Sequence, residues 1–168
     1  IFGPLGMSNS LFNDNINQVI SNRAYGYRKV EDHSWEIFMT NLNYVGDGGV
    51  FTNLEDMLAW DQNFYANKLG RGTQSLIELV ETPHPDTIQM TDDGPVNVNY
   101  AFGMRSDELF GEFAIAHSGG WVAFSTMYFR FPDLDLSVAV MCNSAEVDGP
   151  DLARKVGEIA VAAIKNDE

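Results

Sequence analysis

Three apolar segments follow one another closely in the second half of the chain, at residues 113–118, 124–131 and 136–142. Each has the length and the β-branched or aromatic content of a strand. The connections between them are too short to hold a crossover helix, so neighbouring strands should run antiparallel. Residues 96–104 alternate apolar with polar or small side chains and predict a fourth strand. We therefore expect an α+β fold with an antiparallel sheet of about four strands.

The C-terminal part of the sequence indicates how this sheet is covered. Residues 136–141 are apolar or small on both faces, which is typical of a strand covered on both sides. The segment after Asp148 carries a proline in its first turn and predicts a C-terminal helix. We expect this helix to pack on the sheet through one apolar stripe, formed by Leu152, Val156, Ile159, Ala160 and Ala163.

The front half predicts mainly helices and loops. Thr52 can cap a helix in which Glu55 reaches back, and Gly70 is expected to end it. A second helix fits residues 73–82, stopped by Pro83, and residues 83–95 form a loop. The 168 residues suit a single domain, with residues 1–95 as a mainly helical part and 96–168 as the sheet with its C-terminal helix.

Composition excludes several classes of function. With 10 basic and 24 acidic residues, the net charge of −14 repels phosphate backbones, so no nucleic-acid partner is expected. No apolar run is long enough to span a bilayer, and Cys142, the only cysteine, excludes an internal disulfide. The chain opens inside an apolar segment without an initiator methionine, which we interpret as the C-terminal part of a longer protein.

The sequence His117-Ser118-Gly119-Gly120 joins two predicted strands and allows two interpretations. The glycines can simply supply the backbone angles of a hairpin connection. Alternatively, a strand edge without side chains lets the Gly120 N–H approach a reacting carbonyl and stabilise its developing negative charge. One such donor is half of an oxyanion hole.

Ser118 also fits a relaxed nucleophile-elbow pattern, A-x-S-x-G. That motif requires a strand, a sharp turn and a helix, with the catalytic histidine later in the chain. Here a strand is predicted at residues 124–131 and no histidine follows His117. Ser118 is therefore not expected to be a nucleophile.

The triplet His117-Ser118-Gly119, followed by Phe131-Pro132 and an apolar strand from Leu136 to Asn143, resembles the third active-site motif of the serine β-lactamase and penicillin-binding-protein family. The resemblance is to its class C-like branch, in the H-x-G form. Three upstream segments resemble the stretch between the family's second and third motifs, so the resemblance covers nearly the whole chain: residues 4–7, 24–27 and 48–52 with Asp56.

This resemblance implies a β-lactamase/transpeptidase-like fold and a serine acyl hydrolase that acts on β-lactams, esters or D-amino-acid peptides through an acyl-enzyme. The family's Ser-x-x-Lys motif is missing, because no serine here has a lysine three residues later. Tyr65-Ala66-Asn67 spells the Tyr-x-Asn motif, but it follows the Pro4-Leu5-Gly6-Met7 segment that the family's tyrosine precedes. We expect both motifs to lie before Ile1 and this chain alone to be inactive.

The resemblance also assigns roles residue by residue. His117 takes the place of the cationic third-motif residue, Gly119 that of the required glycine, and Gly120 that of the second oxyanion donor. Ser118 and Trp121 would contact substrate, although Trp121 can equally fill the hairpin packing. A histidine, with an ordinary pKa of about 6.5, is only partly charged at neutral pH. The H-x-G form therefore resembles the family's esterases and D-amino-acid peptidases more than its β-lactamases.

The sequence says little about cofactors and partners. His33 and His84 lack ligand partners at suitable spacing, so neither a metal nor a cofactor is expected. The expected partners are an acyl substrate and the missing N-terminal part of the same protein, and an unpaired sheet edge would favour a homo-dimer. The sequence leaves the compartment open; the family resemblance is compatible with an exported or periplasmic protein, whose signal peptide would lie upstream. The alternative function is a non-catalytic binding or regulatory module with the same shape.

Overall fold

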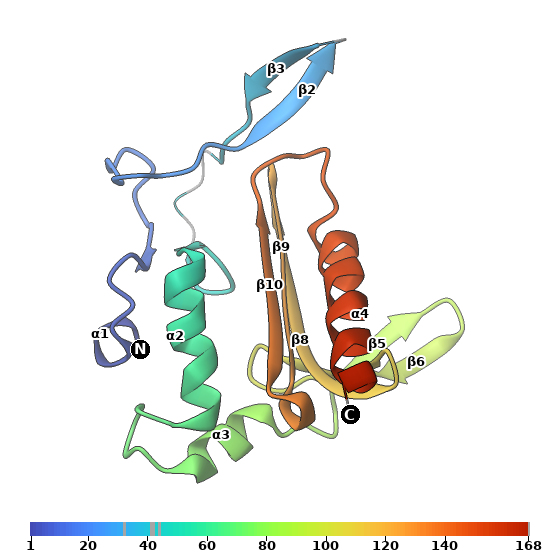
Figure 1. The fold of residues 1–168 in the computed structure, drawn as a ribbon. Helices are drawn as coiled ribbons and strands as arrows, with labels where there is room; N and C mark the ends of the chain where they lie inside the picture. The colour runs from blue at the N-terminus through green and yellow to red at the C-terminus, as the bar shows by residue number, and fades with distance from the viewer. Residues whose placement is uncertain (32, 41–42, 44, 168) are drawn as a thin grey trace. The chain divides into compact units, whose positions relative to one another are not determined.

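The structure is a computed structural model that describes residues 1–31, 33–40, 43 and 45–167 (Figure 1). It is an α+β fold with antiparallel sheets and a C-terminal helix, as predicted. The chain divides into two compact units. The first comprises Ile1–Gln74, Gly120–Ser125 and Cys142–Asp148, and the second comprises Ser75–Gly119, Thr126–Met141 and the chain from Gly149 onward. The boundary near residue 95 that the sequence suggests stays a prediction.

A four-stranded sheet forms the centre of the second unit, in the order β10-β9-β8-β7. The three predicted strands are confirmed as β8 (Glu112–Trp121), β9 (Phe124–Phe131) and β10 (Leu136–Cys142). A short 3-10 turn, Pro132–Leu134, joins β9 to β10, and Asp135 leaves it with a φ of 48°. The tight connections keep neighbouring strands antiparallel, as their length requires.

The predicted fourth strand at residues 96–104 is wrong. The sheet ends instead with β7 (Arg105–Leu109), while β5 (Ile88–Thr91) and β6 (Gly94–Asn97) form a separate hairpin. Left-handed backbone at Asn99 (φ 50°) and Gly103 (φ 79°) interrupts the extended chain between β6 and β7. Because β7 reads Arg-Ser-Asp-Glu-Leu, an edge strand of this kind has almost no apolar periodicity to detect.

Helix α4 (Gly149–Asp167) lies along one face of this sheet (Figure 1). The face that packs differs from the predicted stripe. Leu152, Val156 and Ile159 are 42%, 45% and 72% exposed, whereas Ala153 and Val161 are buried with the sheet residues. The core cluster comprises Leu109, Ala114, Ala116, Met127, Phe129, Phe131, Val138, Ala153 and Val161.

The reason for this rotation of α4 is the size of its residues. A Cβ placed on Gly157 would lie 2.6 Å from Cζ of Phe129, a ring with no exposed surface. Small residues at Ala153 and Gly157 therefore let the helix approach the aromatic face of β9 closely, where a larger side chain at position 157 would clash.

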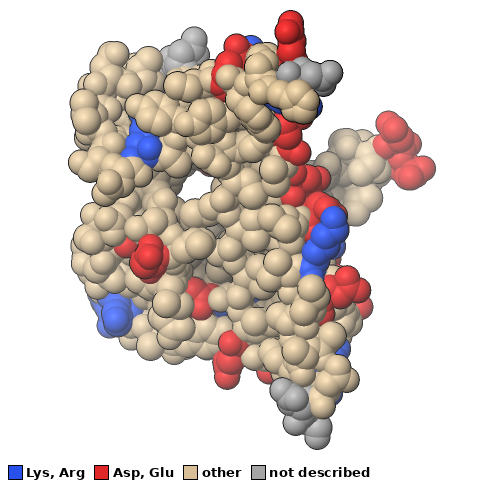
Figure 2. Space-filling model, turned by 45° about the horizontal axis from the view of Figure 1, so that its top comes forward, with Lys and Arg blue, Asp and Glu red and all other residues tan. Residues whose placement is uncertain are grey.

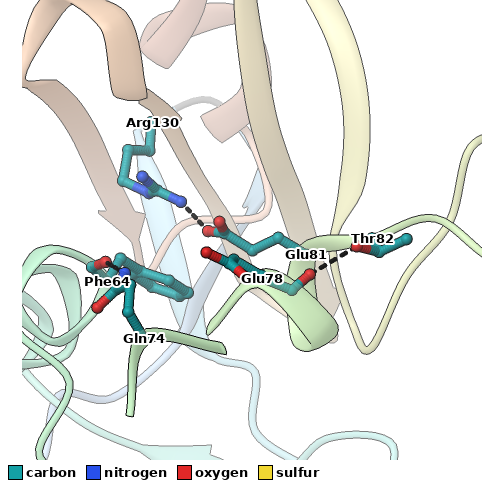
Figure 3. Close-up of polar contacts among 6 residues, drawn as sticks. All are labelled: Phe64, Gln74, Glu78, Glu81, Thr82 and Arg130. Atoms are coloured by element: carbon teal, nitrogen blue, oxygen red, sulfur yellow. Dashed lines mark hydrogen bonds and ion pairs between the residues drawn. The ribbon is translucent and has the colours of Figure 1, made fainter. Parts of the chain in front are cut away.

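Helix α3 (Gln74–Glu81) is confirmed within one residue of its predicted ends. It buries Ile77, and its last residue, Glu81, forms an ion pair with Arg130 of β9 (Figure 3). The Arg130 side chain is 3% exposed. The hydroxyl of Thr82 donates to the carbonyl of Glu78 at 2.6 Å and closes the last turn. The ion pair thus attaches the end of α3 to the sheet.

The first unit contains short elements. Its helices are α1 (Phe2–Leu5) and α2 (Leu54–Tyr65), and β1 (Leu11–Phe12) pairs with β4 (Val50–Phe51). The hairpin of β2 (Tyr27–Glu31) and β3 (Ser34–Ile37) is exposed along nearly all of its length. The side chain of Gln74 donates to the carbonyl of Phe64 at 2.7 Å (Figure 3).

The predicted ends of α2 need correction. Asn53 is its N-cap, since the Asn53 side chain accepts from the Asp56 N–H at 2.9 Å. Thr52 instead shares a hydrogen bond with the hydroxyl of Ser10 at 2.7 Å. The helix ends at Tyr65, five residues before Gly70. Asn53 takes the cap because its side chain directly precedes the first helical turn, where an amide oxygen serves as well as a hydroxyl.

Segments from both ends of the chain meet within the first unit. The Tyr27 N–H donates to the carbonyl of Asn143, and the Ala145 N–H donates to the carbonyl of Tyr27, both at 2.9 Å. A Cβ on Gly26 would lie 2.9 Å from the Cβ of Ala123. This unit is therefore complete only when residues from three stretches of sequence have come together.

On the face shown in Figure 2, most of the surface is formed by uncharged residues. Acidic side chains, with some basic ones beside them, gather toward the right-hand side of this view. Within the part of the chain that the structure describes, no helix is both long enough and apolar enough to cross a membrane.

Candidate active site

The H-x-G triplet lies near the end of β8, beyond the stretch that pairs with β7. The β7–β8 register runs from Leu109 opposite Glu112 to Arg105 opposite Ala116. Residues 114–116 are buried, whereas His117 and Ser118 are exposed and Gly119 is partly buried. Strand β8 therefore passes from the packed interior of the sheet to an accessible end at the triplet itself.

His117 has a defined partner that the sequence reasoning missed. Its Nε2 lies 2.9 Å from the hydroxyl oxygen of Tyr100, and the two rings meet edge to face with centroids 5.9 Å apart. In the sequence, Tyr100 reads only as one apolar position of a predicted strand. No local pattern connects it with a histidine that lies 17 residues later.

The two glycines after the histidine have different surroundings. A Cβ on Gly119 would come closer than 3.0 Å to the Oγ1 of Thr126, whose hydroxyl donates to the Gly119 carbonyl at 3.4 Å. A Cβ on Gly120 would meet no heavy atom within 4 Å, and Gly120 does not have a positive φ. Packing therefore explains Gly119, but neither packing within the described chain nor backbone conformation requires a glycine at position 120.

The two residues predicted to contact substrate are both exposed. Ser118 follows His117 on the accessible part of β8, and 56% of the Trp121 surface is open to solvent. Trp121 thus does not act as a core residue of the hairpin. A large aromatic surface left open at this position is available to contact an acyl group.

The other two histidines lie in turns. The N–H of His84 donates to the Tyr100 carbonyl, and its Nδ1 accepts from the N–H of Asp86 at 3.2 Å, so it stabilises a turn. His33 has a left-handed backbone in the β2–β3 turn. Among the described residues, no group of three or more histidine, cysteine or carboxylate side chains is placed to hold a metal ion.

An open hollow of about 460 Å³ borders the Tyr100 side of the site. It is lined by parts of residues 79–87 and 100–102, and its wall is formed mainly by apolar side chains such as Leu79, Pro83 and Phe102. Tyr100 therefore lines this hollow and also bonds to the imidazole of His117.

Comparison with known proteins identifies the family of this chain. The family model described as Beta-lactamase matches residues 1–161. D-aminopeptidases of Brucella ovis and Gluconobacter oxydans are 25% and 24% identical over 162 and 143 residues, which is 96% and 85% of this chain. The matches cover 29% and 26% of those two proteins, so the chain spans less than a third of their length.

Two solved structures have a similar fold. The octameric penicillin-binding protein homologue from Pyrococcus abyssi has a TM-score of 0.75 and 21% identity, covering 96% of this chain and 36% of that one. The penicillin-binding protein from Bacillus halodurans has a TM-score of 0.70 and 19% identity, covering 95% of this chain and 47% of that one.

Proposed function

Because this chain belongs to the β-lactamase family, we propose that it supplies the H-x-G part of the active site of a serine acyl hydrolase. The Ser-x-x-Lys nucleophile and the Tyr-x-Asn motif come, in this proposal, from polypeptide outside these 168 residues. Two observations support it: no serine here has a lysine three residues later, and the chain spans less than a third of the curated relatives it matches.

The proposed substrate is an amide or ester with a D-configured amino acid at the acyl position. The two D-aminopeptidases support this class, as does the histidine at position 117. An exposed imidazole can bind polar substrate groups without the fixed positive charge that a lysine would present to a carboxylate. Ser118 and Trp121 contribute contacts to the acyl group.

The proposed reaction proceeds in two steps through an acyl-enzyme. The serine hydroxyl gives its proton to the lysine of the Ser-x-x-Lys motif and attacks the substrate carbonyl, whose oxygen becomes negatively charged. Collapse of this intermediate expels the amine or alcohol, which takes up that proton. Water then attacks the acyl-serine ester, and the acid is released. During both steps the Gly120 N–H donates to the negatively charged oxygen, together with the N–H of the serine itself.

The observation that carries this proposal is the empty space over Gly120. Gly120 is the penultimate residue of β8 and is exposed, and neither its φ nor its surroundings would exclude an alanine. A cause other than packing or backbone conformation is therefore proposed for this glycine. A reacting carbonyl that must approach the backbone closely provides that cause. Loss of one such donor lowers kcat by about 10²–10³-fold in acyl-transfer enzymes.

The test compares this chain with a longer protein that includes the preceding residues of its coding sequence. Both are incubated with a fluorescent penicillin and with D-alanyl p-nitroanilide, and labelled peptides are identified by mass spectrometry. The 168-residue chain should give neither turnover nor adduct. The longer protein should be labelled at the serine of a Ser-x-x-Lys motif. An adduct on Ser118 in the short chain would refute the proposal.

A second candidate function is a non-catalytic binding module of the same fold, which the missing Ser-x-x-Lys motif favours. The coding sequence ahead of Ile1 distinguishes the two candidates. If it contains Ser-x-x-Lys and then Tyr-x-Asn, the hydrolase is supported; if it contains neither, the binding module is.

We also propose that the protein self-associates, since a structural neighbour is octameric and β7 is an edge strand of the sheet. Light scattering over a range of concentrations tests this. A monomer mass at millimolar concentration would contradict it.

A further inference from the structure

Tyr100 and His117 form a hydrogen-bonded pair. The Tyr100 hydroxyl and the His117 Nε2 are 2.9 Å apart, a normal hydrogen-bond distance, and the rings also contact edge to face. His117 is exposed on β8. An exposed imidazole samples several rotamers unless a fixed partner holds it, so the orientation of this ring depends on how firmly Tyr100 is placed.

The backbone of Tyr100 is held on both sides. Its N–H donates to the Thr87 hydroxyl at 3.1 Å, and its carbonyl accepts from the His84 N–H at 2.9 Å. It also forms an antiparallel bridge with Arg105, the first residue of β7. Arg105 in turn pairs with Ala116, the residue before His117. The tyrosine and the histidine are thus connected through two consecutive strand pairings.

We propose that Tyr100 is a positioning residue for His117, whose phenolic hydroxyl donates to Nε2 and so keeps the ring proton of the neutral imidazole on Nδ1. A phenol O–H is a stronger donor than the N–H of a neutral imidazole, which decides the direction of this hydrogen bond. When the imidazole is protonated, Nε2–H donates to the phenol oxygen instead. The contact therefore fixes the ring in both charge states, while Nδ1–H remains a donor for other groups.

This inference deepens the proposed function, since it concerns the histidine of the H-x-G triplet, but its main test does not require activity. Long-range ¹H–¹⁵N spectra of the 168-residue chain with ¹⁵N-labelled histidine report the tautomer of each ring directly. Spectra are recorded at about pH 8.5, above the ordinary titration range of histidine. A His117→Gln variant identifies the His117 signals.

His117 should show the Nδ1–H pattern. His84 provides an internal reference of the opposite kind, because its Nδ1 accepts from the Asp86 N–H and its proton must lie on Nε2. In Tyr100→Phe the ring packing is retained and only the hydroxyl is lost. The His117 signals should then move to the Nε2-rich mixture of a free imidazole, while the His84 pattern stays unchanged.

Two results would overturn the inference. One is an Nε2–H pattern for His117 in the unmodified chain, and the other is an unchanged His117 pattern in Tyr100→Phe. Tyr25→Phe, a half-exposed tyrosine of the first unit, is the matched control and should leave the His117 pattern unaltered. Circular dichroism shows whether each variant retains the fold.

Acylation of the longer protein provides a second readout. Tyr100→Phe should lower the acylation rate constant about tenfold, the effect of one hydrogen bond, whereas Tyr25→Phe should not change it. If the longer protein is not acylated at all, the proposed function fails while the tautomer result still stands. If acylation occurs but the His117 tautomer does not depend on Tyr100, the inference fails and the proposed function survives.

Discussion

Alanine substitutions at the two adjacent glycines of β8 should have opposite effects on stability. In Gly119→Ala the new methyl group would lie closer than 3.0 Å to the Thr126 Oγ1. Overpacking of this kind costs about 1–3 kcal/mol, and replacing a strand glycine by alanine returns about 0.5–1 kcal/mol. The net expectation is a loss of about 1–2 kcal/mol. Thr126 can rotate away only by giving up its hydrogen bond to the Gly119 carbonyl.

Gly120→Ala should gain the free energy of replacing a strand glycine by alanine without any cost of overpacking. Its methyl group meets no atom within 4 Å and its φ is not positive, so the variant should gain about 0.5–1 kcal/mol. The two variants differ by one position on one strand and carry the same substitution. They therefore control for each other in composition and in helix or strand propensity.

Urea unfolding followed by tryptophan fluorescence measures both effects. With an m value of about 2 kcal/mol/M, Gly119→Ala should lower the midpoint by about 0.5–1 M and Gly120→Ala should raise it by about 0.3–0.5 M. Adding Thr126→Ala to Gly119→Ala should recover most of the loss, since it removes the clashing hydroxyl. In the longer protein, Gly120→Ala should nevertheless reduce acylation. If Gly120→Ala is as destabilising as Gly119→Ala, Gly120 is a structural glycine and the argument for an open oxyanion site fails.

Three further substitutions test contacts within each of the two units. Gly157→Ala should gain about 1 kcal/mol of helix propensity but lose more against Phe129, lowering the melting temperature; an increase would contradict the close helix–sheet contact. Asn53→Ala should cost about 1 kcal/mol in urea unfolding through loss of the α2 cap, and an unchanged midpoint would rule out that cap. Glu81→Gln removes the charge opposite the buried Arg130 and should cost about 3 kcal/mol, whereas a loss below about 1 kcal/mol would give the pair no more than surface strength.

Much of the sheet could be predicted from the sequence because its signals are local. Strands β8 to β10 are rich in apolar and aromatic residues and have short connections, and Pro83 marks the end of α3. The prediction of a strand at residues 96–104 was wrong because alternation does not reveal where the backbone turns left-handed, as it does at Asn99 and Gly103. Strand β7 was not predicted because its residues are mostly polar, as is usual for an edge strand.

The buried face of α4 could not be predicted from apolarity alone. The buried face is built around Ala153, Gly157 and Val161, and not around Leu152, Val156 and Ile159. Phe129 already fills the space in front of Gly157, so a small residue is needed there. The position of His117 at the accessible end of a strand followed from sequence. Its partner Tyr100 did not, because that contact depends on an isolated bridge between Tyr100 and Arg105 that no sequence pattern reveals.

The interleaving of the two compact units also bears on the order in which the chain can fold. Tyr27 acquires its hydrogen-bond partners at residues 143 and 145, more than a hundred positions later. The first unit therefore has a high contact order, and loop closure must precede its completion. During synthesis on the ribosome, the N-terminal elements must wait for nearly the whole chain to emerge, and a cut anywhere between Gly26 and Asn143 would separate segments that this unit requires.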